Sequence, residues 1–268
     1  MAARIEDSSG QIHIAIENGI GWFVLDNPHK LNAMSISMWQ TLTAALDELE
    51  NDPTLRCIVL TGKGDTAFCV GADIAEMETN ALGAHAAQEY DRIAKDALHR
   101  LQAFSKPAIA MISGYCLGAG VGLAVACDLR VASEGSRFGV PAAKLGIGYY
   151  YAGVKRLTDL VGPSKAKQII FTADRFDAAD MLRAGLIDVL LPAPDLAAHV
   201  ASLAARIAGN APLTIAAAKL AIETACGVPN ERDLEACAAH EHACMNSQDY
   251  AEGRRAFLEK RAPLFKGC

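Results

Sequence analysis

Residues 106–128 have the sequence KPAIAMISGYCLGAGVGLAVACD, in which a strand pattern changes abruptly into a helix pattern. Pro107 to Ile112 form a short, continuous apolar run, as expected of a strand buried on both faces. Several glycines follow, and apolar residues 123–126 then continue with helical character. Such a helix start leaves unpaired backbone N–H groups, which can hold an oxyanion where missing side chains let a ligand approach. Tight packing of helix against strand would also explain the glycines.

The composition indicates an α/β protein with a sizeable core. The chain has 268 residues, of which 51% are hydrophobic, enough for one large domain or a domain with an appendage. The net charge of −6 gives no electrostatic footprint for nucleic acid. No apolar run reaches the length of a membrane span, and the first ten residues lack a signal-peptide core. Eight cysteines without paired spacing are typical of reduced thiols, so we expect a cytoplasmic protein.

The order of the expected elements favours layered α/β packing in the first part of the chain. Asn18-Gly19 predicts the turn of a β-hairpin, and Ser35 or Ser37 can cap the helix that follows. Strand and helix patterns then alternate: strand 57–60, helix 83–104, strand 107–112, helix 118–126 and strand 129–132.

The second part of the chain is mainly helical. We expect helices at about 153–161, 164–172 and 177–184, the last with Asp177 as its N-cap and Gly185 just after its end. A strand follows at 186–191, and the pattern is helical from 194 onward. The expected division is a core over residues 1–193 and a C-terminal helical region over residues 194–268.

Several stretches together resemble one known family. They are NPHKLNAM (27–34), AFCVGADIAEM (67–77), residues 106–128, FDAADMLRAGLIDVLLP (176–192) and the ending EGRRAFLEKRAPLFKG (252–267). In this order they are similar to the crotonase superfamily, also called the enoyl-CoA hydratase/isomerase family. The resemblance spans nearly the whole chain. It implies an α/β fold made of a spiral of β-β-α units, with a C-terminal helical region that forms a homotrimer or a dimer of trimers.

The resemblance also implies a ligand, an acyl thioester of coenzyme A. Coenzyme A would be part of the substrate, and no separate cofactor is expected. The family holds the thioester carbonyl between two backbone N–H groups that stabilise an enolate-like oxyanion. Those donors correspond to Ala72 and Ala119, the second where the family usually has glycine. A backbone donor survives this replacement where the dihedral angles suit a residue with a Cβ.

Other residues correspond to the family's substrate-binding positions. Val70, Asp73 and Ile74 fall, with Ala72, where the family backbone wraps adenine and pantetheine, and Gly118 precedes the second donor. Lys30 and Lys260 fall near where basic side chains meet the phosphates of coenzyme A. Taken alone, the two lysines would be read as solvated surface charges.

The family's usual acid–base residues are absent. Hydratases of this family use two glutamates, and their positions here are Gly122 and Ala142. The dehalogenase and dienoyl-isomerase branches have an aspartate at the position of Tyr150. None of these three residues is a carboxylic acid, so we do not expect ordinary hydration.

Two kinds of side chain offer other proton-transfer groups. Tyr149, Tyr150 and Tyr151 lie in the loop that lines the acyl pocket in the family, as hydrogen-bond donors or as aromatic walls. His99 falls where the dehalogenase branch has an active-site histidine, or it is an exposed residue of helix 83–104. The sequence therefore predicts an acyl-CoA-processing enzyme resembling enoyl-CoA hydratase/isomerase. The alternative is a non-catalytic acyl-CoA-binding member of the family.

One cluster of metal-ligand residue types occurs near the end of the chain. It consists of Cys237, His240, His242 and Cys244. In a helix, residues 237, 240 and 244 share a face while 242 points away, so four ligands would not converge. We therefore predict no metal site.

Overall fold

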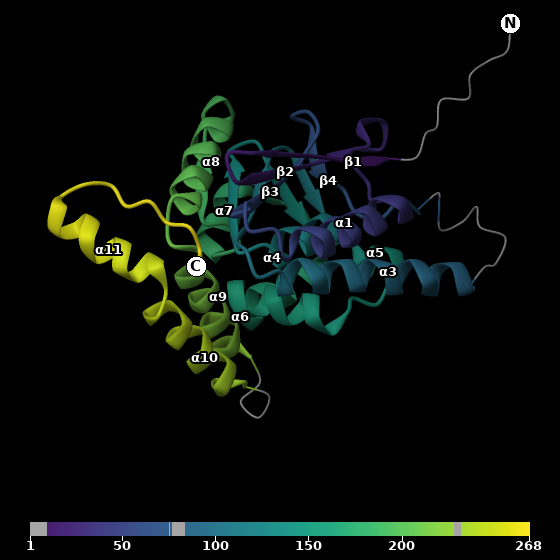
Figure 1. Cartoon of the computed structure of the whole chain (residues 1–268). Coiled ribbons are helices and arrows are strands. Elements are labelled where there is room, and N and C mark those ends of the chain that lie inside the picture. Colours follow the sequence, from purple (N-terminus) through teal and green to yellow (C-terminus); the bar gives the residue numbers. More distant parts are fainter. Residues whose placement is uncertain (1–9, 75, 77–83, 228–231) are drawn as a thin grey trace, which may run out of the picture.

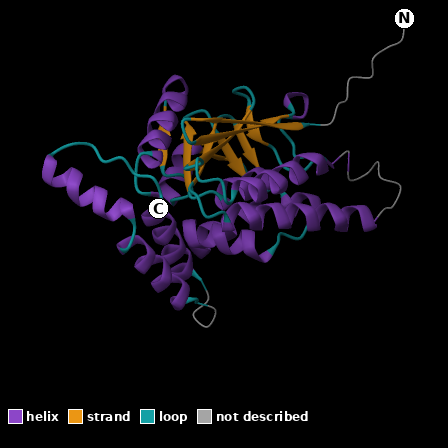
Figure 2. Ribbon diagram, viewed as in Figure 1, coloured by secondary structure: helices purple, strands orange, loops and turns teal. Residues whose placement is uncertain are grey.

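The computed structural model describes residues 10–74, 76, 84–227 and 232–268. The chain forms two β-sheets surrounded by helices, with a helical arm that projects to one side (Figures 1 and 2). The strands are β1 (Gln11–Glu17), β2 (Ile20–Asp26), β3 (Cys57–Gly62), β4 (Ala67–Cys69), β5 (Ala108–Ile112), β6 (Tyr115–Leu117), β7 (Leu129–Ser133), β8 (Arg137–Gly139), β9 (Phe176–Asp177) and β10 (Val189–Leu191).

The helices carry most of the chain between and after these strands. They are η1 (Pro28–Lys30), α1 (Ile36–Leu49), α3 (Ala84–Ala103), α4 (Ala119–Ala126), α5 (Ala142–Leu145), α6 (Tyr151–Thr172), α7 (Ala178–Ala184), α8 (Ala193–Ala208), α9 (Pro212–Cys226), α10 (Leu234–Met245) and α11 (Gln248–Glu259). Among the described residues, no single helix is long and apolar enough to cross a membrane. The pair α8 and α9 meets that test only together and is bent by 103°.

The two sheets are built by consecutive strands that alternate between them. The six-stranded sheet has the order β1-β2-β3-β5-β7-β10, and the four-stranded sheet has the order β4-β6-β8-β9. The pairs β3/β4, β5/β6 and β7/β8 each give one strand to each sheet, so the chain advances as a spiral of β-β units with helices between them. Both sheets are parallel except at β1/β2 and β8/β9. The predicted α/β class and spiral are confirmed.

Helix α8 packs on the six-stranded sheet, although the sequence assigned it to the C-terminal region. Leu196 and Val200 of α8 form an apolar cluster with Val59 and Ile109 of the central strands. Helices α9, α10 and α11 instead project away from the sheets as an arm (Figure 1). The packing therefore places α8 with the core, and the arm begins after Gly209.

Some predictions for the shorter elements are confirmed and others are not. The two helices expected at 153–161 and 164–172 are present as the two segments of α6, which meet at a kink at Gly162. Gly162 has the non-helical dihedrals φ +75° and ψ 161°, and Pro163 after it lacks an N–H, so the first segment ends there and the second begins. Strands β4, β6 and β9 have three residues or fewer, too short for a periodic pattern, and the sequence analysis missed them.

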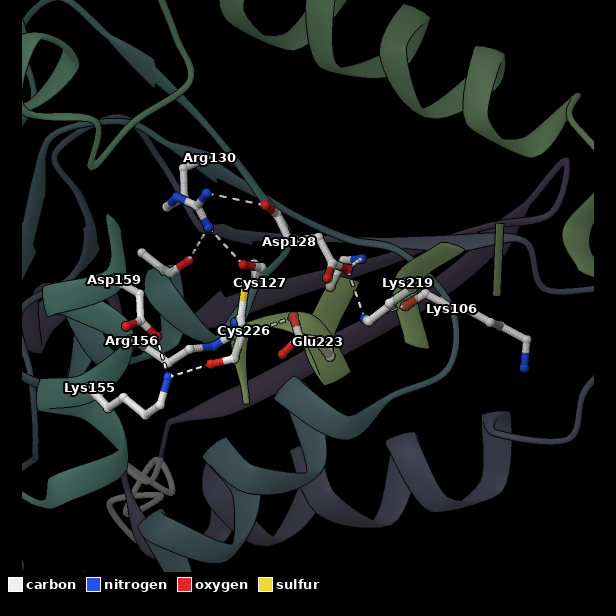
Figure 3. A network of polar contacts seen from close by, with 12 residues as sticks. Lys106, Cys127, Asp128, Arg130, Lys155, Arg156, Asp159, Lys219, Glu223 and Cys226 are labelled. Carbon is white, nitrogen blue, oxygen red and sulfur yellow. Dashed lines mark hydrogen bonds and ion pairs between the residues drawn. The ribbon is translucent and has the colours of Figure 1, made fainter. Parts of the chain in front are cut away.

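Helix α4 is fixed at its C-terminal end by a buried arginine. The guanidinium of Arg130, only 4% exposed, donates hydrogen bonds to Cys127 O at 2.7 Å and to Leu186 O at 2.8 Å. It also contacts Asp188, whose carboxylate lies 3.1 Å away. Figure 3 shows this arginine above Cys127 and Asp128. A cation among the last carbonyls of a helix complements the helix dipole.

The glycines of α4 have different surroundings. A Cβ on Gly120 would lie 2.1 Å from Cys69 O, a backbone atom that cannot move aside. A Cβ on Gly122 would have its nearest neighbour at 3.5 Å, an ordinary contact distance. The absence of a side chain at residue 120 therefore permits the close packing of α4 on β4.

We predict that Gly120→Ala lowers the free energy of unfolding by about 1–3 kcal/mol, because overpacking forces the backbone apart. The matched variant Gly122→Ala is expected to leave stability unchanged or raise it by up to about 1 kcal/mol through helix propensity. Urea denaturation of both variants measures the difference. Equal stabilities would contradict the packing argument.

Candidate functional site

A cavity of about 480 Å³ lies where α4 begins. One wall is α3, another is the loop 140–150, and the two glycine-containing segments 70–72 and 118–119 meet between them. Its lining is mainly apolar, with few titratable side chains. The lining residues are Trp39, Val70, Gly71, Ala72, Ile74, Gln88, Tyr90, Asp91, Ala94, Lys95, Leu98, Gly118, Ala119, Val140, Pro141, Ala142, Leu145, Ile147, Gly148, Tyr149 and Tyr150.

The two glycine-containing segments lie next to each other. A Cβ on Gly71 would lie 3.6 Å from Ala119 N, and a Cβ on Gly118 would lie 3.6 Å from the Cα of Gly71. Both glycines have positive φ, +121° and +53°, which residues with a side chain rarely adopt. Glycine therefore serves at both positions for its conformation, since a Cβ would have only ordinary contacts there.

Segment 71–73 is held in place by a short parallel bridge to Met34. Met34 N–H donates to Gly71 O at 2.8 Å, and Asp73 N–H donates to Met34 O at 2.9 Å. The N–H of Ala72, between these two bonds, takes no part in the bridge. Ala119 is the first residue of α4, so its N–H has no acceptor inside the helix.

In the part of the chain that the structure describes, neither of these two N–H groups has a hydrogen-bond acceptor. Both residues line the cavity. Unpaired backbone donors are uncommon in folded proteins, because an unsatisfied N–H costs free energy. The arrangement is therefore suited to a ligand that carries a hydrogen-bond acceptor or a developing negative charge.

Two tyrosines form the wall next to the start of α4. Their ring centroids are 5.6 Å apart, and the hydroxyl of Tyr149 donates to Gly118 O at 3.2 Å. Burial raises the pKa of Tyr149 above its ordinary value. Burial, and to a lesser extent the charge of Asp91, raises the pKa of Tyr150 to about 12. Both phenols therefore keep their protons at neutral pH, and that of Tyr149 acts as a donor.

The opposite wall, α3, contains side chains that the sequence analysis missed. The hydroxyl of Tyr90 donates to Met34 O at 2.7 Å and accepts from Trp39 Nε1 at 2.9 Å, which ties α3 to α1 and to the Met34 bridge. Asp91 and Lys95, an ion pair one helical turn apart, also line the cavity. Their i, i+4 spacing next to Leu98, on the helix predicted at 83–104, was the available signal.

The cavity brings together most of the site residues expected from the sequence. The residues in its lining are Val70, Ala72, Ile74, Gly118, Ala119, Ala142, Tyr149 and Tyr150. Gly122 is buried behind this wall, where a Cβ would lie 3.6 Å from the hydroxyl of Tyr149. Asp73 is buried beside the site and accepts a 2.6 Å hydrogen bond from Lys30 Nζ. Lys30 therefore neutralises a buried carboxylate at the edge of the site.

Three further expected site residues lie apart from the cavity. His99 is exposed on α3, because it follows the inward-facing Leu98 by one residue and a step of one residue turns a helix by about 100°. Tyr151, at the start of α6, has 76% of its surface exposed. Lys260 caps α11, on the projecting arm. Among the described residues, no hydrogen bond or ion pair joins any of the three to another expected site residue.

The cysteine and histidine cluster of α10 forms local hydrogen bonds. Cys237 Sγ lies 3.4 Å from Thr224 Oγ1, His240 Nδ1 lies 2.9 Å from Ala236 O, and His242 pairs with Asn246. Within the described ranges, no group of three or more His, Cys, Asp or Glu side chains could hold a metal ion.

Comparison with known proteins gives a consistent result. A family model described as "Enoyl-CoA hydratase/isomerase" matches residues 15–268. The chain is 33% identical to crotonyl-CoA hydratase of Syntrophomonas wolfei over 93% of its length and 95% of that protein's. It is 34% identical to short-chain-enoyl-CoA hydratase of Clostridium acetobutylicum, covering 91% and 93% of the two chains.

A solved structure shares the fold. It is an enoyl-CoA hydratase/carnithine racemase from Magnetospirillum magneticum, with a TM-score of 0.90, 32% identity and coverage of 96% of both chains. The chain therefore belongs to the enoyl-CoA hydratase/isomerase family, within the crotonase superfamily.

The raised pKa of Tyr150 predicts a loss of stability at high pH. Because the unfolded phenol titrates near 10 and the folded one at about 12, the contribution is complete below about pH 10 and is lost as pH rises toward 12. Between about pH 8 and about pH 10.5, the free energy of unfolding is expected to fall by about 1 kcal/mol less in Tyr150→Phe than in the wild type. Urea denaturation at both pH values measures it.

The control is Tyr151→Phe, which removes a hydroxyl from the exposed neighbouring ring. It is expected to keep the pH dependence of the wild type. An unchanged pH dependence in Tyr150→Phe would contradict the burial of its phenol.

Proposed function

We propose that the protein processes an acyl thioester of coenzyme A by stabilising an enolate-like oxyanion between the N–H groups of Ala72 and Ala119. The observation that carries the proposal is the pair of unpaired backbone donors in an apolar cavity. A thioester oxygen there would receive two hydrogen bonds away from bulk water, where such bonds are strongest. Family membership supports a thioester as ligand, since the relatives are described as crotonyl-CoA and short-chain-enoyl-CoA hydratases.

The reaction proposed is not ordinary hydration. In this family, water is added with the help of two glutamates, and Gly122 and Ala142 stand at their positions. Neither can transfer a proton. Tyr150 is the proposed hydrogen-bond donor to the developing charge, because it lines the cavity and stays protonated, whereas its raised pKa disfavours transfer of the proton. A protein that binds acyl-CoA without turnover is the alternative, favoured by the same two replacements.

Ala119→Pro tests the backbone donor directly. Proline is tolerated at the first position of a helix, and its ring carbon replaces the hydrogen of the N–H that would be unpaired there. We expect the variant to lose about 10²–10³-fold in turnover of any acyl-CoA substrate. We also expect it to lose the red shift in absorbance that a bound conjugated thioester, cinnamoyl-CoA, shows when its carbonyl is polarised.

A thermal denaturation curve accompanies this test and verifies that Ala119→Pro is folded. A folded variant with the full red shift of the wild type would contradict the role of the Ala119 donor.

Hydration of crotonyl-CoA is expected to be slow. Each missing acid–base group costs about 10²–10⁴-fold in rate. The measurement is the loss of the conjugated enone absorbance of crotonyl-CoA, with the affinity for the thioester determined in parallel. His99→Ala is expected to behave as the wild type, because that side chain is exposed.

Fast hydration that is abolished in Tyr150→Phe would show that another group replaces the glutamates. Tight binding of several acyl-CoA thioesters without turnover of any would favour the non-catalytic alternative.

We also propose that the arm joins copies of this chain into a trimer or a dimer of trimers. Its helices expose large apolar side chains, among them Phe257 and Leu258 at 83% and 80% and Leu234 at 67%. An apolar groove of about 880 Å³ runs between α9, α10 and α11. Exposed apolar area of this kind is typical of an interface. Because the C-terminal region forms trimers in this family, we propose that the groove binds a second copy of this chain.

Light scattering is expected to give three or six times the monomer mass of 28.3 kDa. Phe257→Asp should shift the mass toward the monomer, because it places a charge in the apolar surface. A wild-type mass of 28.3 kDa would contradict the assembly.

A further inference from the structure

The peptide unit between Gly118 and Ala119 has two functional ends. Its N–H is the second donor of the cavity, and its carbonyl oxygen accepts hydrogen bonds from Gly122 N–H and from the hydroxyl of Tyr149, both at 3.2 Å. In a trans peptide the C=O and N–H point in opposite directions. Whatever holds the oxygen therefore fixes the direction of the N–H.

This peptide follows a glycine, Gly118, whose backbone can rotate more freely than that of any other residue type. Gly118 has φ +53° and ψ −116°, a combination that is accessible essentially to glycine alone. Rotation about its ψ would turn the following peptide and move the Ala119 N–H away from the cavity. The bond from Gly122 restrains the peptide from the helix side, and the bond from Tyr149 restrains it from the loop 140–150.

Tyr149 is suited to a permanent role as donor. Among the described residues it is the one side chain that bonds to this peptide. Burial raises its pKa, so the hydroxyl keeps its proton across the physiological range. A hydrogen bond to a peptide oxygen also polarises the peptide and strengthens its N–H as a donor.

The glycine at residue 122 makes room for this hydroxyl. A Cβ at residue 122 would already be in van der Waals contact with Tyr149 Oη, at 3.6 Å, so a branched side chain there would crowd the phenol. Gly122 and Tyr149 thus belong to one arrangement, in which a phenol occupies the space beside the start of α4.

We propose that Tyr149 is a positioning residue, which holds and polarises the 118–119 peptide so that the Ala119 N–H stays directed at a thioester carbonyl. The inference rests on the proposed function. It assigns a different role to Tyr149 than to Tyr150, whose hydroxyl makes no hydrogen bond to this peptide in the described part of the chain.

The test compares Tyr149→Phe with the wild type in binding cinnamoyl-CoA and the matching thioether of coenzyme A, which lacks the carbonyl. Loss of one net hydrogen bond corresponds to roughly 2- to 10-fold in affinity. We expect that loss for the thioester only, together with a smaller red shift of the bound cinnamoyl absorbance. The control is Tyr115→Phe, which removes a hydroxyl outside the cavity and should change neither affinity nor shift.

Gly122→Val is a second variant, which keeps the phenol but crowds its hydroxyl. It should reduce the red shift as Tyr149→Phe does, and it keeps the test usable if one variant fails to fold. A full red shift and unchanged thioester affinity in a folded Tyr149→Phe would overturn the inference and leave the proposed function intact. No red shift in the wild type would overturn the proposed function, and the inference with it.

Discussion

The site depends on the close packing of α4 on β4, which leaves no room for a side chain at Gly120. Segment 70–72 and the first turn of α4 meet at Gly71 and Gly118, and Gly120 packs against Cys69 O. This contact lets β4 and β6 pair as neighbours in the smaller sheet. It also places two N–H groups from distant parts of the sequence on one cavity wall. A single methyl group at residue 120 would push the two segments apart, and the donors with them.

Helix α4 is consequently held at both ends by different means. At its start, contacts between backbone atoms fix the position. At its end, the buried guanidinium of Arg130 bonds to Cys127 O (Figure 3). It also bonds to Leu186 O, with Asp188 beside it. A buried cation with several carbonyl acceptors and one carboxylate is costly to disturb, because removing one partner leaves another without compensation. The N–H of Ala119, at the start of this helix, is therefore held in a fixed position within the core.

The sequence predicted the parts of the fold that have a strong local pattern. The glycine-interrupted stretch 106–128 predicted a strand and a helix, and both are present as β5 and α4. Strand β6 lies within the same stretch, but its three residues carry no period that distinguishes a strand from a loop. The candidate site could likewise be predicted only in part. The donors Ala72 and Ala119 followed from resemblance, whereas Tyr90 and Asp91 required knowing which face of α3 points inward. The rotation of α3 about its own axis was also unknown, which explains why His99 was considered as a site residue although it lies outside the cavity.

The arm is closed onto the core at its far end. The guanidinium of Arg56 donates to Phe265 O and Lys266 O, across 209 and 210 residues of sequence, and buried Asp249 accepts from Lys266 N–H and Gly267 N–H. Contacts between residues this far apart in the sequence are expected to form late in folding, because closing the loop costs entropy before any bond compensates for it. During synthesis the core strands can pair well before residues 265–267 exist. The arm, with its apolar surface, would then take up its final position last, after the two sheets of the core have folded.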